Sequence, residues 1–176
     1  MHPNVVTFEL FGLPEKPKCF MLMHFLHSSL ESIPVLCVDD ALKMVKHLSA
    51  GLSFMHELGF SHSDVKAANV CMGGQYAQPA FILVDLDSTS LFGLRAISTR
   101  PYVPRDLLPT DGGRPFASAA LDWWMLGYML AEKCCPREAC LDVAAQAVSF
   151  TRSELYDYLR AHLPSSVFGL WNTTVR

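Results

Sequence analysis

The 176-residue chain has few charged residues and no strong excess of either sign. Charged side chains make up 18% of the sequence, and the formal net charge at pH 7 is -3. A chain without a basic stripe lacks the electrostatic footprint that nucleic acids and anionic membranes attract. No apolar run reaches the roughly 18 residues of a membrane-spanning helix. We therefore expect neither a nucleic acid nor a membrane among its partners.

Cysteine occurs without the spacing that would give it a structural role. The cysteines show neither the paired spacing of a zinc site nor a secretory leader before them. We therefore expect reduced thiols and a cytoplasmic location, with a nuclear one also compatible. The six residues are Cys19, Cys37, Cys71, Cys134, Cys135 and Cys140.

Apolar side chains, in contrast, make up 51% of the residues. A chain of this length and content can bury one sizeable core, so the sequence predicts a single domain. Residues Val5–Phe11 and Cys19–Phe25 are rich in β-branched and aromatic side chains, and the Pro-rich turn Leu13–Lys18 between them predicts a hairpin. Val70–Met72 and Phe81–Val84 read as short buried strands.

Three segments predict helices. In the first, Asp39 or Asp40 can cap a helix whose apolar residues recur every three to four positions and which ends near Gly59. The second, at residues 117–134, is apolar nearly all round, which indicates a helix buried at the centre of a domain.

The third helix opens on the capping-box pattern Thr151-Arg152-Ser153-Glu154. It is expected to be the last helix and to run through about His162, where Pro164 stops it.

The run His62-Ser63-Asp64-Val65-Lys66-Ala67-Ala68-Asn69, followed by a buried strand that leads into Asp85, carries most of the chemistry. Transfer of a phosphoryl group needs a positioned nucleophile and neutralised phosphate oxygens more than covalent help. Asp64 would take the proton of an attacking hydroxyl, and Lys66 would balance charge on the phosphate. Asn69 and Asp85 would bind Mg²⁺ through hard oxygen atoms.

These residues resemble the motifs of eukaryotic protein kinases, in the order in which that family carries them. The first run is similar to the catalytic loop His-Arg-Asp-x-Lys-x-x-Asn, and Asp85-Leu86-Asp87 is similar to the metal motif Asp-Phe-Gly. Before the catalytic loop, His2-Pro3-Asn4 and the run Cys19–Leu26 are similar to the entry into the fourth strand and to the hinge of the family. After it, Thr99–Asp106 resembles the end of an activation segment, and Asp122-Trp123-Trp124-Met125-Leu126-Gly127 resembles the helix under the catalytic loop.

The resemblance implies an α+β fold that is mainly helical, with ATP and Mg²⁺ as cofactors and a protein as substrate or partner. Residues 1–29 would be a two-stranded remnant of the N-terminal lobe with the hinge, and residues 30–176 the C-terminal lobe. Met23, His24, Leu26, Cys71 and Asp85 would then contact the nucleotide.

The resemblance also implies a structural role for Asp122, which would accept backbone N–H bonds from the catalytic loop. His62 would pack and hydrogen-bond rather than carry protons. Thr99 resembles the threonine that marks serine/threonine kinases.

Some features of the family are missing or altered. The sequence contains no Gly-rich loop with the required spacing and no matching strand lysine. Ser63 stands where the family has an arginine that pairs with a phosphorylated activation loop, so that route of regulation is expected to be lost. Asp87 replaces a glycine, and Asp106 replaces a glutamate whose arginine partner the sequence does not identify.

Three functions therefore remain open. The first is a serine/threonine protein kinase, inactive or very slow as this stretch of chain. The second is a non-catalytic pseudokinase that binds a partner protein. The third is a small-molecule phosphotransferase of the aminoglycoside or choline kinase type, against which Lys66 and the Asp122 helix argue. The surface that an N-terminal lobe would cover is expected to be apolar and to favour self-association.

Overall fold

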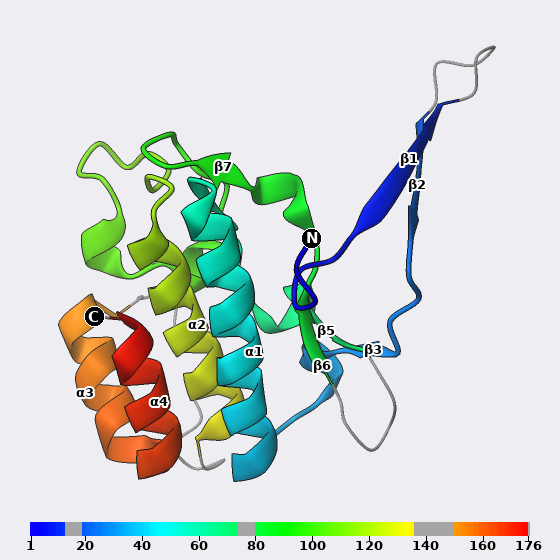
Figure 1. Cartoon of the computed structure of the whole chain (residues 1–176). Coiled ribbons are helices and arrows are strands. Elements are labelled where there is room, and N and C mark those ends of the chain that lie inside the picture. Colours follow the sequence, from blue (N-terminus) through cyan, green and yellow to red (C-terminus); the bar gives the residue numbers. More distant parts are fainter. Residues whose placement is uncertain (13–18, 74–79, 136–149, 176) are drawn as a thin grey trace.

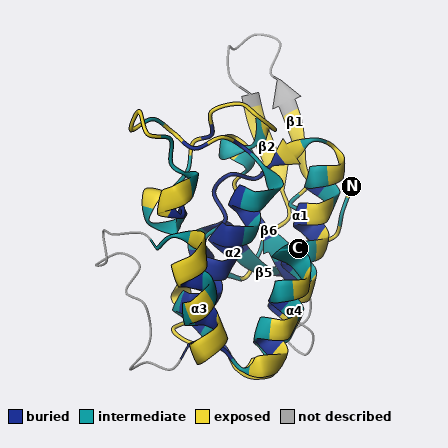
Figure 2. Cartoon of the chain, turned by 90° about the vertical axis from the view of Figure 1, so that its left-hand side faces the viewer, coloured by how far each residue is buried: buried dark blue, intermediate teal, exposed yellow. Residues whose placement is uncertain are grey.

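The computed structural model describes residues 1–12, 19–73, 80–135 and 150–175. In this part of the chain, four α-helices pack around one apolar core (Figure 1): α1 (Val38–Glu57), α2 (Ala119–Cys134), α3 (Arg152–His162) and α4 (Ser165–Val175). Helix α2 contacts the other three helices, and α4 also packs on α1. Figure 2 shows that buried residues line the sides on which these helices face one another.

The described strands form three small sheets. An antiparallel hairpin joins β1 (Phe8–Gly12) to β2 (Cys19–Met23). The central sheet has the order β3-β5-β6, and a third sheet pairs β4 with β7. Their bounds are β3 Ser28–Ser29, β4 Phe60–Ser61, β5 Val70–Gly73, β6 Ala80–Leu83 and β7 Ser90–Leu91. The predicted mixture of helix and strand is therefore confirmed.

The first helix begins earlier than predicted. Neither Asp39 nor Asp40 caps α1, because the N-cap is Cys37 and the two aspartates lie in the first turn. That position still suits them, since carboxylates interact favourably with the positive end of the helix dipole. The predicted apolar stripe is buried, and Leu48 and Leu52 are fully covered.

Helix α2 is buried over most of its circumference, as its composition predicted. It begins at Ala119, two residues later than expected, because the Ser118 side chain accepts a hydrogen bond from the backbone N–H of Leu121. This helix packs against α1, α3 and α4 and carries Asp122 in its first turn.

The capping box that opens α3 is confirmed: the Thr151 hydroxyl accepts from the backbone N–H of Glu154, whose carboxylate accepts from the backbone N–H of Thr151. The prediction that this is the last helix is wrong. Pro164 ends one helix and directly precedes α4, because its fixed φ angle also suits a helix start.

The hairpin lies apart from the helices, and most of its described side chains are exposed (Figures 1 and 2). Its strands have the predicted order, but residues before Phe8 leave the ladder because they bond to β6 instead. The backbone of Val6 donates to the carbonyl of Leu83 (2.8 Å), and Leu83 donates to the carbonyl of Asn4 (2.9 Å). The predicted turn at residues 13–18 lies outside the described residues.

Candidate active site

One buried carboxylate, that of Asp122, anchors the loop that follows β4. It accepts hydrogen bonds from the backbone N–H groups of His62 (2.9 Å) and Ser63 (2.8 Å) and from the hydroxyl of Ser61 (2.9 Å). Its Oδ2 atom also lies 2.8 Å from Nε2 of His56 on α1. Asp122 is 0% exposed, so removing any of these partners would leave a buried polar group unsatisfied. The backbone contacts predicted for Asp122 are confirmed.

Ser63 occupies an unusual backbone conformation inside this loop. Its φ angle is 69°, which side chains with a Cβ atom rarely adopt, and the residue is fully buried. Its hydroxyl lies 2.9 Å from that of Ser61. Ser63 therefore presents no charge at this position, as the sequence indicated.

The adjacent residue, Asp64, makes contacts with three other parts of the site. One carboxylate oxygen accepts a hydrogen bond from Lys66 Nζ (2.7 Å) and one from Asn69 Nδ2 (3.1 Å). The other oxygen accepts from the backbone N–H of Thr99 (2.8 Å), and Lys66 also donates to the Thr99 hydroxyl (2.8 Å). The structure thus brings Asp64, Lys66 and Asn69 together and adds Thr99 from a segment 35 residues away.

These contacts determine the charge state of Asp64. Burial alone would raise the pKa of this carboxyl, but the hydrogen bonds from Lys66 and Thr99 together outweigh burial and hold the pKa below its ordinary value. Asp64 is consequently ionised at neutral pH and can accept a proton or a hydrogen bond from a nearby hydroxyl.

Asp85 reaches the same end of the central sheet from β6. The backbone N–H of Val84, the residue before it, donates to the carbonyl of Asn69 (3.0 Å), and the carbonyl of Val84 lies 3.0 Å from His62 Nε2. Asp85 itself has a φ of 61° and an exposed side chain. The structure therefore ties the residue before Asp85 to Asn69 and His62, and no hydrogen bond among the described residues joins the Asp85 carboxylate to Asp64, Lys66 or Asn69.

The free oxygen atoms at this edge suit a hard divalent cation. Asn69 uses its NH₂ group toward Asp64, and among the described residues no donor occupies its Oδ1 atom or the Asp85 carboxylate. One carboxylate and one amide oxygen match the way Mg²⁺ is held when water and phosphate oxygens complete its shell. The described residues contain no group of three or more His, Cys, Asp and Glu side chains that could hold a metal ion. A metal site formed by protein ligands alone is therefore absent from this part of the chain.

The residues predicted to contact a nucleotide base lie partly around one hollow. His24 and Leu26 line a cavity of about 320 Å³ together with Val5, Val6 and Ile82, among others. This volume lies at the lower end of the range for small-molecule sites.

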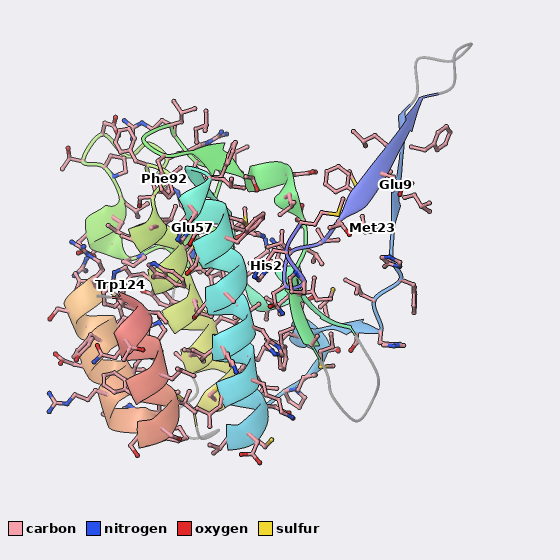
Figure 3. The ribbon with its side chains drawn as sticks, viewed as in Figure 1. His2, Glu9, Met23, Glu57, Phe92 and Trp124 are labelled. Carbon is pink, nitrogen blue, oxygen red and sulfur yellow. The ribbon has the colours of Figure 1, made fainter. Side chains whose placement is uncertain are left out.

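Two further predicted residues lie beside this hollow. Cys71 on β5 pairs with Ile82 on β6, so their side chains share one face of the central sheet. Met23 lies at the end of β2 (Figure 3), is 47% exposed, and lines a neighbouring hollow with His24.

Sequence reasoning missed two contacts that shape the site. The predicted but unidentified partner of Asp106 is Arg152, at the start of α3, whose Nε lies 2.6 Å from the carboxylate and whose backbone N–H donates to it as well. Its position 46 residues away gave no local signal. The second is the backbone N–H of Thr99, which no side-chain pattern could have revealed.

Comparison with known proteins places this geometry in context. The model of the family described as protein kinase domain matches residues 1–160. A serine/threonine-protein kinase of Schizosaccharomyces pombe is 27% identical over 150 residues, which cover 74% of this chain and 22% of that protein. A candidate serine/threonine-protein kinase of Caenorhabditis elegans is 28% identical over 144 residues, which cover 66% of this chain and 39% of that protein.

The chain thus spans between about a fifth and two fifths of the length of these two relatives. None of its described helices is long and apolar enough to cross a membrane.

Proposed function

The chain belongs to the protein kinase domain family, and on that basis we propose that it carries a phosphoryl-transfer site of the serine/threonine protein kinase type. The observation that carries the proposal is the contact of one ionised carboxylate, Asp64, with Lys66, Asn69 and Thr99 at once. An anion, a cation and a neutral amide within hydrogen-bond distance are the groups that in-line transfer of a phosphoryl group requires.

In this proposal Asp64 orients the attacking hydroxyl and accepts its proton. Its lowered pKa keeps it ionised at neutral pH, and its hydrogen bonds hold the carboxylate in one orientation. Lys66 neutralises charge on the transferred phosphate while the Thr99 hydroxyl holds its ammonium group in place.

Asn69 and Asp85 would hold Mg²⁺ on the phosphates of ATP, through Asn69 Oδ1 and the Asp85 carboxylate. A bound Mg²⁺ draws negative charge from the phosphate oxygens and so lowers the barrier to transfer. His24 and Leu26 would contact the base: within the described part of the chain, their backbone N–H and C=O groups form no hydrogen bond to other backbone groups.

We expect transfer by this stretch of chain alone to be slow or undetectable. The 176 residues hold no Gly-rich phosphate loop, so a triphosphate would lack the backbone donors that such a loop supplies. A protein acceptor is favoured over a small molecule because the two relatives carry the names of serine/threonine-protein kinases.

The experiment is a transfer assay with the purified chain, radiolabelled ATP, Mg²⁺ and a mixture of serine- and threonine-containing peptides. Any transfer should vanish in Asp64→Asn and fall by about 100-fold or more in Lys66→Ala. The matched control is Lys43→Ala, whose ammonium lies on the surface of α1 near Asp40. Transfer that survives Asp64→Asn would contradict the assignment.

The exposed hairpin favours a second candidate, a non-catalytic module that binds a protein through this surface. Six large apolar residues of β1 and β2 are 40% to 61% exposed, and protein interfaces bury such groups. A triple variant, Asp64→Asn with Asn69→Ala and Asp85→Asn, separates the two functions. If the triple variant loses nucleotide binding but still associates through the hairpin, the kinase site and the interface are independent features. If the wild-type chain itself binds no nucleotide, the non-catalytic module is favoured.

A further inference from the structure

The segment that leads from β7 to Thr99 is paired with the loop that precedes α2. The backbone N–H of Gly93 donates to the carbonyl of Ala117 (2.9 Å), and Ala117 donates back to Leu94 (2.8 Å). Further along, Ala96 donates to the carbonyl of Pro115 (2.9 Å). Figure 3 labels Phe92, which marks the beginning of this segment above α1. Residues 93–96 and 115–117 thus form a short antiparallel ladder outside the named sheets.

Arg95 lies at the centre of this ladder and contacts the opposite loop in three ways. Its Nη2 atom donates to the carboxylate of Asp111 (2.9 Å), and its Nη1 atom donates to the carbonyl of Arg114 (2.7 Å). The guanidinium also lies over the ring of Phe116, 4.2 Å from its centre. We call this set of contacts the Arg95 clip.

The loop that receives Arg95 is itself held in shape. The other oxygen of Asp111 accepts the backbone N–H of Gly113 (2.8 Å), which is the largest cause of the lowered pKa of this carboxyl. Arg100 donates to the carbonyl of Gly112 (2.8 Å), so two arginines of one segment bind the same loop. Asp111 is therefore an ionised and oriented acceptor at neutral pH.

The other end of the segment reaches the catalytic loop. The Ser98 hydroxyl donates to the carbonyl of Ser63 (2.5 Å), the residue with the positive φ angle. The next residue, Thr99, donates its backbone N–H to Asp64 and accepts from Lys66. Two residues separate Arg95 from Ser98 and three separate it from Thr99, so the position of Arg95 limits where Ser98 and Thr99 can lie.

We propose that Arg95 is a positioning residue, whose clip to Asp111 and Phe116 holds residues 95–99 against the catalytic loop without a phosphate group on the chain. The carboxylate of Asp111 supplies the fixed negative charge in this arrangement. The neutral Ser63 offers no cation that a phosphate on this segment could bind. The inference rests on the proposed function, because the segment that it fixes is the one that orients Asp64.

The contacts must act together for the clip to work. Both side chains of the ion pair between Arg95 and Asp111 are exposed, and exposed ion pairs contribute little to stability. The guanidinium stacking on Phe116, the bond to the Arg114 carbonyl and the backbone ladder add contacts that do not depend on the opposite charge.

Amide hydrogen exchange, followed by NMR on enzymatically dephosphorylated protein, tests the proposal without requiring catalysis. In the wild type, the amides of Ala96, Thr99 and Ala117 should be protected. In Arg95→Gln they should exchange about fivefold faster, while the amide of Met125 in the buried helix α2 keeps its rate. In Arg95→Lys, which retains the charge but loses the planar guanidinium, the exchange rates of these amides should lie between those of the wild type and those of Arg95→Gln.

The matched control is Arg114→Gln, because the Arg114 side chain makes no hydrogen bond or ion pair to any described residue. If Arg95→Gln unfolds, Asp111→Asn removes the acceptor charge and should speed the same amides. Rapid exchange of Thr99 in the dephosphorylated wild type would overturn the proposal, and so would equal rates in Arg95→Gln and Arg114→Gln. None of these exchange measurements requires phosphoryl transfer, so they test the Arg95 clip independently of kinase activity.

Discussion

At the scale of single residues, the site depends on carboxylates whose partners are donors from distant parts of the chain. Asp122 shows this most clearly, since its two oxygens accept from a helix histidine, a serine hydroxyl and two backbone N–H groups. A buried charge of this kind is stable only while all its donors are present. The shape of the loop that carries Asp64 therefore depends on a residue 58 positions further along the sequence.

Replacing Asp122 with Asn should destabilise the fold by roughly 3 kcal/mol, because an amide cannot accept from both backbone N–H groups and from His56. Chemical denaturation monitored by circular dichroism measures the change. Asp157→Asn, on the exposed face of α3, is the control and should change stability by less than about 0.5 kcal/mol. Equal stabilities for the two variants would show that the Asp122 network is not needed.

The lowered pKa of Asp64 predicts a specific acid sensitivity. A carboxyl whose pKa is lower in the folded state stabilises the fold above its unfolded pKa of about 3.9, and this contribution is lost as the pH falls through the folded value. The wild type should therefore be more stable than Asp64→Asn at pH 6, and this difference in stability should shrink as the pH falls below the ordinary pKa of the carboxyl. Denaturation curves across this range measure the difference; a gap that grows on acidification would contradict the sign.

Local spacing made part of this site predictable. Asp64, Lys66 and Asn69 lie within six residues, so a loop brings them together whatever the rest of the chain does. Asp85 could be added because a short buried strand leads directly into it. The Asp106 and Arg152 pair and the Arg95 clip join residues 46 and 16 positions apart, and no periodicity in the sequence marks contacts between loops.

At the scale of elements, α4 is the main feature that the sequence did not predict. Pro164 signals the end of α3 and equally permits a new helix, and the short run after it has no strong period. Tertiary packing determines the helix: Trp171 is fully buried, its ring lies 5.5 Å from that of Trp124, and its Nε1 atom donates to the carbonyl of Trp123. Trp124 is labelled in Figure 3.

Two helical glycines test this packing. A Cβ atom at Gly127 would lie 2.9 Å from the Trp171 ring, so Gly127→Ala should destabilise the chain by about 1–3 kcal/mol through overpacking. At Gly169 on α4 no atom lies within 4 Å of the added Cβ, and Gly169→Ala should stabilise by about 0.5–1 kcal/mol. Thermal unfolding measures the change in melting temperature of each variant relative to the wild type. Changes of the same sign in both variants would contradict the packing of α4 on α2.

At the scale of the whole molecule, the hairpin and the helical body differ in how they are stabilised. The body has a continuous core, whereas an isolated two-stranded hairpin is only marginally stable in water. The exposed apolar side chains of β1 and β2 therefore remain available to another surface.

We expect this surface to cause weak self-association. Leu10→Lys with Met21→Lys places two charges on neighbouring positions of one hairpin face and should lower the tendency to associate, because burying a charge without a partner is unfavourable. Sedimentation velocity over a range of concentrations measures this. Val35→Lys, at an exposed apolar residue away from the hairpin, is the control, and a wild type that stays monomeric at high concentration would contradict the expectation.

The central claim is that Asp64, Lys66, Asn69 and Asp85 form one site for a metal-bound polyphosphate. The most direct test is an NMR titration of the labelled chain with ATP, with and without Mg²⁺. We predict shifts at the amides of these residues and of Val84 that require Mg²⁺ and disappear in Asp85→Asn. Shifts that are absent at millimolar nucleotide, or that persist unchanged in Asp85→Asn, would contradict it.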